Sequence, residues 1–223
     1  ISLAEEYALP LWLAFGHMNR GWSRIAQRDI DNGIEELRRG LSMYDASGAR
    51  LWRPHYFGLL AQGLASAERI DDARRELSAA LAIVEETGEF WCASELHRIE
   101  GELVIMQSGS DDRHSTPPQK LPSAAASRAE DCFRQALAIA DKQKARSWKL
   151  RATTSLGRLY HRQGKREEAR RAVEEALEWF KEGHDTEDLK TAQALVNAWH
   201  ATGRTRACPP SRPRSRHPNI TAT

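Results

Sequence analysis

Aromatic and cationic side chains that could stack on a ligand and hold it are concentrated between residues 147 and 177. The residues concerned are Trp148, Arg151, Arg158, Tyr160, His161 and Arg162. The planar guanidinium of arginine forms paired hydrogen bonds with carboxylates, and aromatic rings offer stacking surfaces. The same residue types also serve the packing of helical repeats. Their spacing along the chain must therefore decide between a ligand site and an architectural role.

Other reaction chemistries lack the motifs that they require. The chain contains neither of the phosphate-binding loops GxxxxGK(S/T) and GxGxxG, and neither HExxH nor GxSxG. Its eight histidines are dispersed, and Cys92, Glu95 and His97 come nearest to a metal-ligand cluster. We interpret these three as ordinary helix residues, because a metal site needs its ligands at regular spacing. The sequence predicts no catalytic residue, no metal site and no cofactor.

Charge and cysteine usage separate a near-neutral body from a basic tail. Five of the 33 lysines and arginines follow residue 200, where there is no acidic residue, so residues 1–200 carry 28 basic and 31 acidic side chains, a net charge of −3. The tail lacks interleaved aromatic residues, so we do not expect this segment to bind nucleic acid. Three cysteines without a CxxC pair favour a reducing compartment, and we expect a cytoplasmic protein.

The ends of the sequence bear on its context. No apolar run approaches the roughly 18 residues that cross a bilayer, and no signal peptide is recognisable, so we expect no membrane partner. The opening residues "ISLAEEYALP" read like the end of one helix. We therefore expect a fragment of a longer protein.

An internal repeat organises residues 1–200. The segment "DNGIEELRRGL" recurs forty residues later as "DDARRELSAAL", and then as "RAEDCFRQAL" and "REEARRAVEEAL". Ahead of each lies a helical stretch with a tryptophan near its start, at Trp12, Trp52, Trp91 and Trp148. A small residue follows nine or ten positions later, at Gly21, Ala61, Gly101 and Gly157. Small residues let two helices approach closely, and we expect the tryptophans to fill gaps between adjacent hairpins.

These patterns predict an all-α fold, an α-solenoid of about four αα-hairpins with a C-terminal capping helix. The expected units cover residues 10–48, 51–88, 91–142 and 147–182, and the capping helix covers 186–200. The third unit carries a Pro- and Ser-rich surplus, which predicts an inserted loop over 108–124. Residues 201–223 are rich in arginine and proline, and we expect them to be disordered.

The repeats resemble tetratricopeptide repeats, and the last unit is the clearest. Leu156, Gly157, Tyr160, Ala169 and Ala176 fall on that family's Leu, Gly, Tyr, Ala and Ala positions. The period is near 40 rather than 34, and the usual closing proline is missing. The resemblance implies a concave groove formed by the outward positions of the first helices. It places there His55, Gln62, Glu95, Arg98, Glu102, Arg151, Arg158, His161 and Arg162.

A closer resemblance covers roughly residues 1–200. The strings "LWRPHYFGLLAQ", "FWCASELHRIEGEL" and "AEDCFRQALAIADKQKARSWKLRATTSLGRLYHRQGKREEAR" are similar to the C-terminal repeat region of large bacterial signalling proteins. In those proteins a nucleotide cyclase or winged-helix domain precedes a STAND-type ATPase domain and the repeats. The resemblance implies a non-enzymatic sensor or scaffold arm that binds a protein or peptide and controls the upstream ATPase or effector domain.

Two alternatives stay open at this point. The segment could be the regulatory end of a polypeptide with adenylate or guanylate cyclase activity, or a sensor that holds a small-molecule inducer between hairpins. Cyclase and ATPase residues belong to segments that are absent here, so none can be assigned in this sequence.

Overall fold

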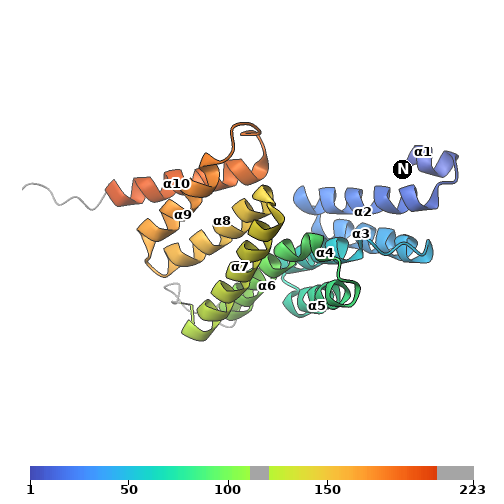
Figure 1. Cartoon of the computed structure of the whole chain (residues 1–223). Helices are drawn as coiled ribbons and strands as arrows, with labels where there is room; N and C mark the ends of the chain where they lie inside the picture. Colours follow the sequence, from blue (N-terminus) through green and yellow to red (C-terminus); the bar gives the residue numbers. More distant parts are fainter. Residues whose placement is uncertain (111–120, 205–223) are drawn as a thin grey trace, which may run out of the picture.

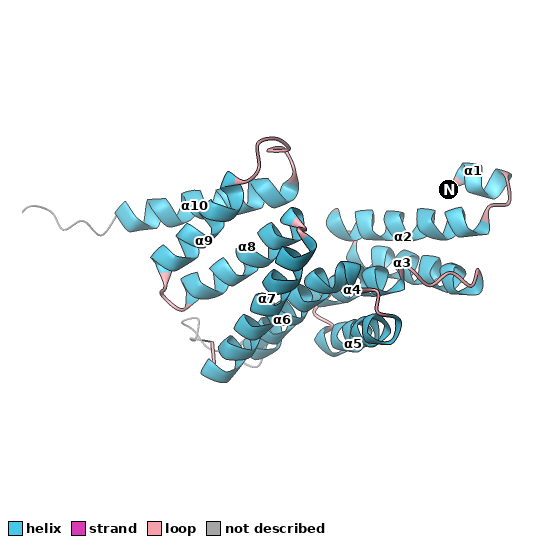
Figure 2. Ribbon diagram, viewed as in Figure 1, coloured by secondary structure: helices cyan, strands magenta, loops and turns pink. Residues whose placement is uncertain are grey.

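A computed structural model describes residues 1–110 and 121–204, which form helices, turns and short loops and contain no strand (Figure 2). The helices of these ranges are α1 (Ser2–Glu6), α2 (Pro10–Ala26), α3 (Ile30–Ala46), α4 (Arg53–Ser66), α5 (Ile70–Thr87), the 3-10 helix η1 (Phe90–Cys92), α6 (Ala93–Ser110), α7 (Ser123–Gln143), α8 (Arg146–Arg162), α9 (Arg166–Glu178) and α10 (Glu187–Arg204). None of the described helices is both long enough and apolar enough to cross a membrane.

The helices form four successive hairpins, α2–α3, α4–α5, α6–α7 and α8–α9, followed by α10 (Figure 1). Each first helix packs on its own second helix, and the first helices also contact one another in order along α2, α4, α6 and α8. Each unit thus touches mainly its neighbours, as in other solenoids. The prediction of an all-α, solenoid-like fold is confirmed.

Backbone turns recur at equal register in the hairpins. Arg28, Glu68 and Gly164 each adopt a left-handed φ, of 70°, 60° and 86°, and each lies seven residues after the small residue of its first helix. The left-handed residue ends one helix and lets the chain reverse within a short turn. The corresponding position of the third unit, Ser108, is still helical in α6. The third hairpin is therefore the one in which the common turn is replaced by a longer connection.

The bounds differ from the sequence-based ones at the insertion and at the C-terminus. Helix α6 continues to Ser110 and α7 begins at Ser123, so the first and last residues of the expected loop 108–124 are helical. Helix α10 extends beyond the expected cap 186–200 to Arg204. Residues 111–120, and residues 205–223 of the tail expected to be disordered, lie outside the described part of the chain.

The core follows the repeat positions. Ala73, Ala129, Ala169 and Val173 on the second helices are fully buried, and Leu189, Ala192 and Val196 of α10 cover the last hairpin. Burial of this apolar stripe removes the end of the solenoid from water, at roughly 25 cal/mol for each Å² of apolar surface. The first helices α4, α6 and α8 are thereby held side by side, and their remaining faces form the candidate site.

Candidate functional site

A polar groove runs across the first helices α4, α6 and α8 and ends at α10. It consists of two adjoining clefts, of about 190 and 250 Å³, which share Gln62, Arg98 and Arg158. The groove is lined by Gln62, Ala65, Ser66, Arg98, Ile99, Glu102, Leu103, Met106, Arg151, Thr154, Ser155, Arg158, Asp188 and Thr191. Five of the residues placed here from sequence therefore lie together, namely Gln62, Arg98, Glu102, Arg151 and Arg158.

A buried ion pair forms the floor of the groove. Arg98 donates from Nε and Nη2 to the two carboxylate oxygens of Glu95, at 2.9 and 2.8 Å. Glu95 is 3% exposed and Arg98 is 9% exposed. Arg151 of α8 reaches the same carboxylate, with Nη2 2.9 Å from Oε1. One carboxylate on α6 thus binds an arginine of its own helix and an arginine of the next unit.

The remaining charges of the groove are partly neutralised by neighbouring side chains. The Ser155 hydroxyl donates to Glu102 at 2.6 Å, and Arg98 Nη1 lies 3.6 Å from the same carboxylate. Arg151 Nε lies 3.6 Å from Asp188 of α10. Within residues 1–110 and 121–204, Arg158 forms no ion pair and its side chain is exposed. Arg158 is therefore the cation of the groove that is available to a ligand.

Two buried polar atoms of the groove also lack a hydrogen-bond partner among the described residues. They are Nε2 of Gln62 and the hydroxyl oxygen of Thr154. An unsatisfied buried polar group costs about 1–3 kcal/mol, so a ligand that bonded to either atom would recover part of that free energy. With Arg158 they provide a donor, a hydroxyl and a cation in one place.

His55 lies beside the groove but within an aromatic cluster. Its ring is 5.3 Å from the ring of Trp91 and 5.4 Å from that of Tyr56. Burial lowers the pKa of His55 below its ordinary value of 6.5; the nearby Glu95 opposes this shift and Arg151 adds to it. The neutral form of the His55 imidazole is therefore favoured in the folded protein.

We expect the protein to lose stability as the pH falls from 7.5 to 5.5. The unfolded chain binds a proton on His55 more readily than the folded chain does, so the stabilisation is complete above about pH 6.5 and is lost as the pH falls through the folded pKa. The pKa of His161 is lowered in the same direction, by burial and by Arg166. The pKa values of Glu36, Glu100 and Glu130 are also lowered, but from an ordinary value of 4.5. These carboxylates therefore change the stability at lower pH than the histidines do.

Urea denaturation of wild type and the variant His55→Gln at pH 7.5 and 5.5 measures this effect. The loss between the two pH values should be smaller in His55→Gln, and smaller again when His161→Gln is added. An equal loss in all three proteins would mean that neither histidine is the group responsible.

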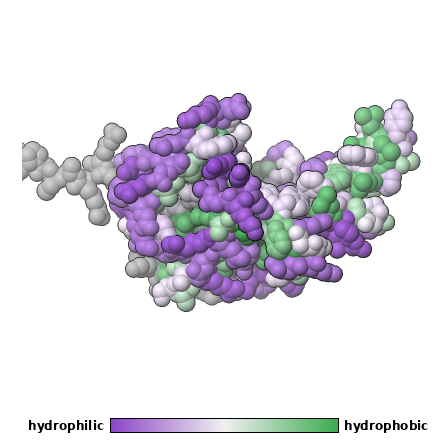
Figure 3. Space-filling model, viewed as in Figure 1, coloured by the Kyte–Doolittle hydropathy of each residue, from purple (hydrophilic) through white to green (hydrophobic). Residues whose placement is uncertain are grey.

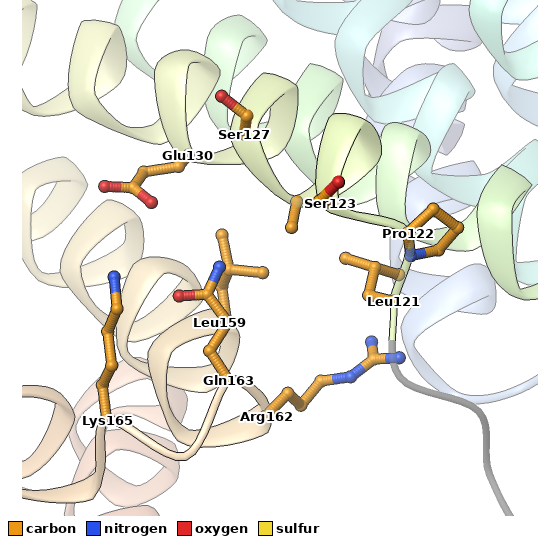
Figure 4. A pocket seen from close by; sticks show the side chains of 10 residues that line it. Leu121, Pro122, Ser123, Ser127, Glu130, Leu159, Arg162, Gln163 and Lys165 are labelled. Carbon is orange, nitrogen blue, oxygen red and sulfur yellow. The ribbon is translucent and has the colours of Figure 1, made fainter.

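His161 and Arg162, also expected in the groove, lie elsewhere. The His161 ring stacks on Trp199 of α10, with the ring centres 5.0 Å apart and the planes at 12°. Arg162 lines a separate cleft of about 640 Å³ between α7 and α8, together with Leu121, Glu130 and Lys165 (Figure 4). His161 and Arg162 lie about one helical turn beyond Arg158, towards the end of α8, where α10 and α7 are the neighbouring helices.

The tryptophans form a ladder along one edge of the first helices. Ring centres are 4.7 Å apart between Trp52 and Trp91, and 6.0 Å apart between Trp91 and Trp148. The expectation that these rings fill gaps between hairpins is wrong for Trp12, which is 64% exposed, and Trp52 is still 40% exposed. The Trp52–Trp91 contact is edge-on, with the ring planes at 69°, and the Trp91–Trp148 contact is stacked, with the planes at 28°.

The contacts of Tyr160, and those of Cys92, Glu95 and His97, indicate structural roles. The Tyr160 hydroxyl donates to Glu130 at 2.9 Å and accepts from Arg134 at 2.9 Å. Cys92 is fully buried, and burial raises the pKa of its thiol to about 12. Glu95 is held by the two arginines, and His97 Nδ1 lies 3.3 Å from Glu100. Cys92, Glu95 and His97 thus have separate partners or surroundings.

A second buried charged cluster, which was not predicted from the sequence, lies between α2 and α3. Glu36 is 8% exposed and is bonded by His17 Nδ1 at 2.9 Å, by Arg24 Nη1 at 3.2 Å and by Arg20. Burial alone would raise the pKa of Glu36, but the hydrogen bonds of Arg20 and His17 bring it below its ordinary value. The positions i, i+3 and i+7 of the three basic residues on one helix face were the available signal.

The comparison with protein-family models agrees with a repeat architecture. Residues 126–182, which cover most of α7 and all of α8 and α9, match the sequence model of the tetratricopeptide repeat family. This part of the chain is thus similar to tetratricopeptide repeats, which generally mediate protein–protein interactions. The chain is also similar to the crystal structure of BtubC (BKLC) from P. vanneervenii, with 18% identity, 96% of this chain and 97% of that chain covered, and a TM-score of 0.47. No curated protein matches the sequence.

Proposed function

We propose that the chain is a protein–protein interaction module that binds a protein or peptide segment in the groove. The observation that carries this proposal is the juxtaposition of Arg158, which forms no ion pair among the described residues, with the unsatisfied Gln62 Nε2 and Thr154 hydroxyl. A cation and free polar atoms over a rigid floor suit a peptide with a carboxylate, because charge-assisted hydrogen bonds are the stronger ones.

The buried Glu95–Arg98–Arg151 network supports this role by fixing the floor. Arg151 is committed to Glu95 and Asp188, so its charge serves the protein itself more than a ligand. A preorganised groove binds at a lower entropic cost than a mobile one. The specific contacts are therefore assigned to Arg158, Gln62 and Thr154.

Peptides selected from a random display library on the immobilised protein provide the probe. We expect charge reversal in Arg158→Glu to weaken binding of the selected peptides by about tenfold to a hundredfold, since a hydrogen bond to a charged group contributes about 1.5–3 kcal/mol. Dissociation constants from fluorescence polarisation measure the loss.

Arg171→Glu on α9 is the matched control, because Arg171 is exposed and lies outside the groove. It should bind as wild type does. If Arg158→Glu binds unchanged, or if Arg162→Glu abolishes binding while Arg158→Glu does not, the groove is not the binding surface.

The wider role that we propose is that of a sensor or scaffold arm in a cytoplasmic bacterial regulator. Partner binding to the repeats would release or restrain an upstream STAND-type ATPase or effector domain. The support is the similarity of residues 1–200 to repeat regions of such proteins, together with the tetratricopeptide region. An upstream sequence without a Walker loop would contradict this role, and metal-binding aspartates of a cyclase there would favour a cyclase-linked polypeptide instead.

A second candidate function, small-molecule sensing, is favoured by the cleft between α7 and α8. Its volume of about 640 Å³ is within the range of ligand sites, and its lining combines the apolar Leu121, Ala126 and Leu159 with the cations Arg162 and Lys165. Figure 4 shows Leu159, Arg162 and Lys165 on one side of the cleft. A metabolite library tested by thermal shift on wild type and Arg162→Glu would reveal such a ligand. A library in which no compound stabilises the wild type counts against this function.

A further inference from the structure

The first twelve residues repeat residues 41–52 without a gap. The pairs are Ile1 and Leu41, Ser2 and Ser42, Leu3 and Met43, Glu5 and Asp45, Ala8 and Gly48, Leu11 and Leu51, and Trp12 and Trp52. The backbones agree too, since Ala8 and Gly48 both have a left-handed φ, of 49° and 78°. Helix α1 therefore has the sequence and the turn of the last part of a second helix, like the end of α3.

Helix α1 uses one face to pack on α2. Ala4 is 8% exposed, at the position of the buried Tyr44, and the side chain of Ile1 lies over Gly16, where a Cβ atom would come within 2.7 Å of it. Leu3, Tyr7 and Leu9 remain 68%, 65% and 44% exposed. In α3, by contrast, the corresponding turn contacts both neighbouring first helices, since the Tyr44 ring is 5.4 Å from the ring of Phe15 in α2 and Asp45 binds Arg53 of α4.

The aromatic ladder is open at the same end. Trp52, Trp91 and Trp148 each contact a ring of the preceding first helix, namely Phe15, Trp52 and Trp91. The ring contact of Trp12 is with Phe15 of its own helix, at 6.1 Å. Figure 3 shows hydrophobic residues gathered at this end of the molecule, over α1 and the start of α2. The terminal face is defined here as Leu3, Tyr7, Leu9 and Trp12.

We propose that the terminal face docks an amphipathic α-helix from polypeptide outside these 223 residues, packed as α2 packs on α3 and α4. That helix carries an aromatic side chain near its start, which would extend the ladder at Trp12. This inference continues the stacking interface between the hairpins and does not rest on the groove.

The acidic charge near the terminal face indicates that the docking helix has a basic flank, and it argues against a second copy of this chain as the partner. Residues 1–19 contain Glu5 and Glu6 but no lysine or arginine. Asp45, at the position of Glu5, is bound by Arg53 with Nε 2.7 Å from Oδ1, but the residue of α2 that corresponds to Arg53 is Leu13, so Glu5 forms no ion pair among the described residues and its charge is left for a partner. Two copies meeting at this face would bring these acidic residues together, so a docking helix with basic side chains on its flank is the better partner.

A chain extended by a copy of residues 10–40 directly ahead of Ile1 tests the proposal. Gly40 of the copy then precedes Ile1 as it precedes Leu41, so the copy supplies a first helix and completes the second one. We expect the amides of residues 2–6 to exchange at least about tenfold more slowly than in the unextended chain, and hydroxyl-radical labelling of Trp12 to fall. Hydrogen exchange and footprinting by mass spectrometry measure the two effects.

Tyr7→Asp separates docking from folding, because Tyr7 is 65% exposed. It should leave the melting temperature of the unextended chain unchanged and reduce the added protection in the extended one. Equal exchange and equal Trp12 labelling with and without the extension would overturn the proposal. So would a dimer of the unextended chain, seen by sedimentation and lost in Tyr7→Asp, because the occupant would then be a second copy.

Discussion

The variant Glu95→Ala should be less stable than the wild type by about 3–5 kcal/mol, the cost of removing one partner of a buried ion pair. Arg98 is 9% exposed and would lose both of its short hydrogen bonds, leaving Glu102 at 3.6 Å as its nearest carboxylate. Arg151 would lose its 2.9 Å contact as well. Urea denaturation at pH 7.5, followed by far-UV circular dichroism, measures the difference.

Two controls show whether burial is the reason. The double variant Glu95→Leu with Arg98→Met removes both buried charges and should recover much of the stability, since replacement of a buried pair by apolar residues is often neutral. Arg75→Ala removes an ion pair with Asp72 in which the arginine is 76% exposed, and should cost less than about 1 kcal/mol. A loss in Glu95→Ala no larger than that in Arg75→Ala would refute the structural role of the network.

The sequence predicted the hairpins because packing positions recur along it. Ala73, Ala129 and Ala169 each stand where a second helix faces its first helix, and each is fully buried. A side chain in that position must be small in every unit, so the same constraint appears four times in the sequence. The end of α10 and the helical ends of the 108–124 segment did not follow from the pattern, since helix boundaries depend on local turns that do not repeat.

The groove followed from the sequence only in part. The resemblance to tetratricopeptide repeats implied which positions of the first helices line a groove, and it placed Gln62, Arg98 and Arg158 among them. The pairing of Arg151 with Glu95 joins residues 56 positions apart, and depends on the angle between α6 and α8 and on side-chain rotamers. Neither quantity is visible in a single sequence. The available cation, Arg158, could therefore not be distinguished from the arginines that serve the fold.

The exposed Trp12 is a second example of a property that a single sequence does not reveal. Its sequence context is that of Trp52, yet its exposure is 64% against 40%, because exposure depends on the neighbour present and not on the residue. Repetition in a sequence identifies an interface position. It does not say whether a given copy of that position has its partner.

The second large loss of stability is expected from a substitution at Gly21, where α2 and α3 approach each other closely. A Cβ atom on Gly21 would lie 2.5 Å from the backbone nitrogen of Leu37 and 2.8 Å from the carbonyl oxygen of Gly33. Both are backbone atoms of α3, so a side chain at Gly21 can be accommodated only if the two helices separate. We expect Gly21→Val to lower the free energy of unfolding by about 3 kcal/mol or more, at or beyond the upper end of the usual cost of overpacking.

The destabilisation by Gly21→Val should be confined to the units next to Gly21, because units of a solenoid depend mainly on their neighbours. This location of the effect serves as a control. In Gly21→Val, hydrogen exchange should accelerate in α2 and α3, while α8 and α9 retain most of their protection. Gly109→Ala is the matched substitution, since a Cβ atom there meets no atom within 4 Å, and alanine in place of a helical glycine is favourable by about 0.5–1 kcal/mol. If Gly21→Val were as stable as Gly109→Ala, the helices would not be held at the separation that the structure shows. The repeat positions Ala61, Gly101 and Gly157 would then need another explanation than close helix packing.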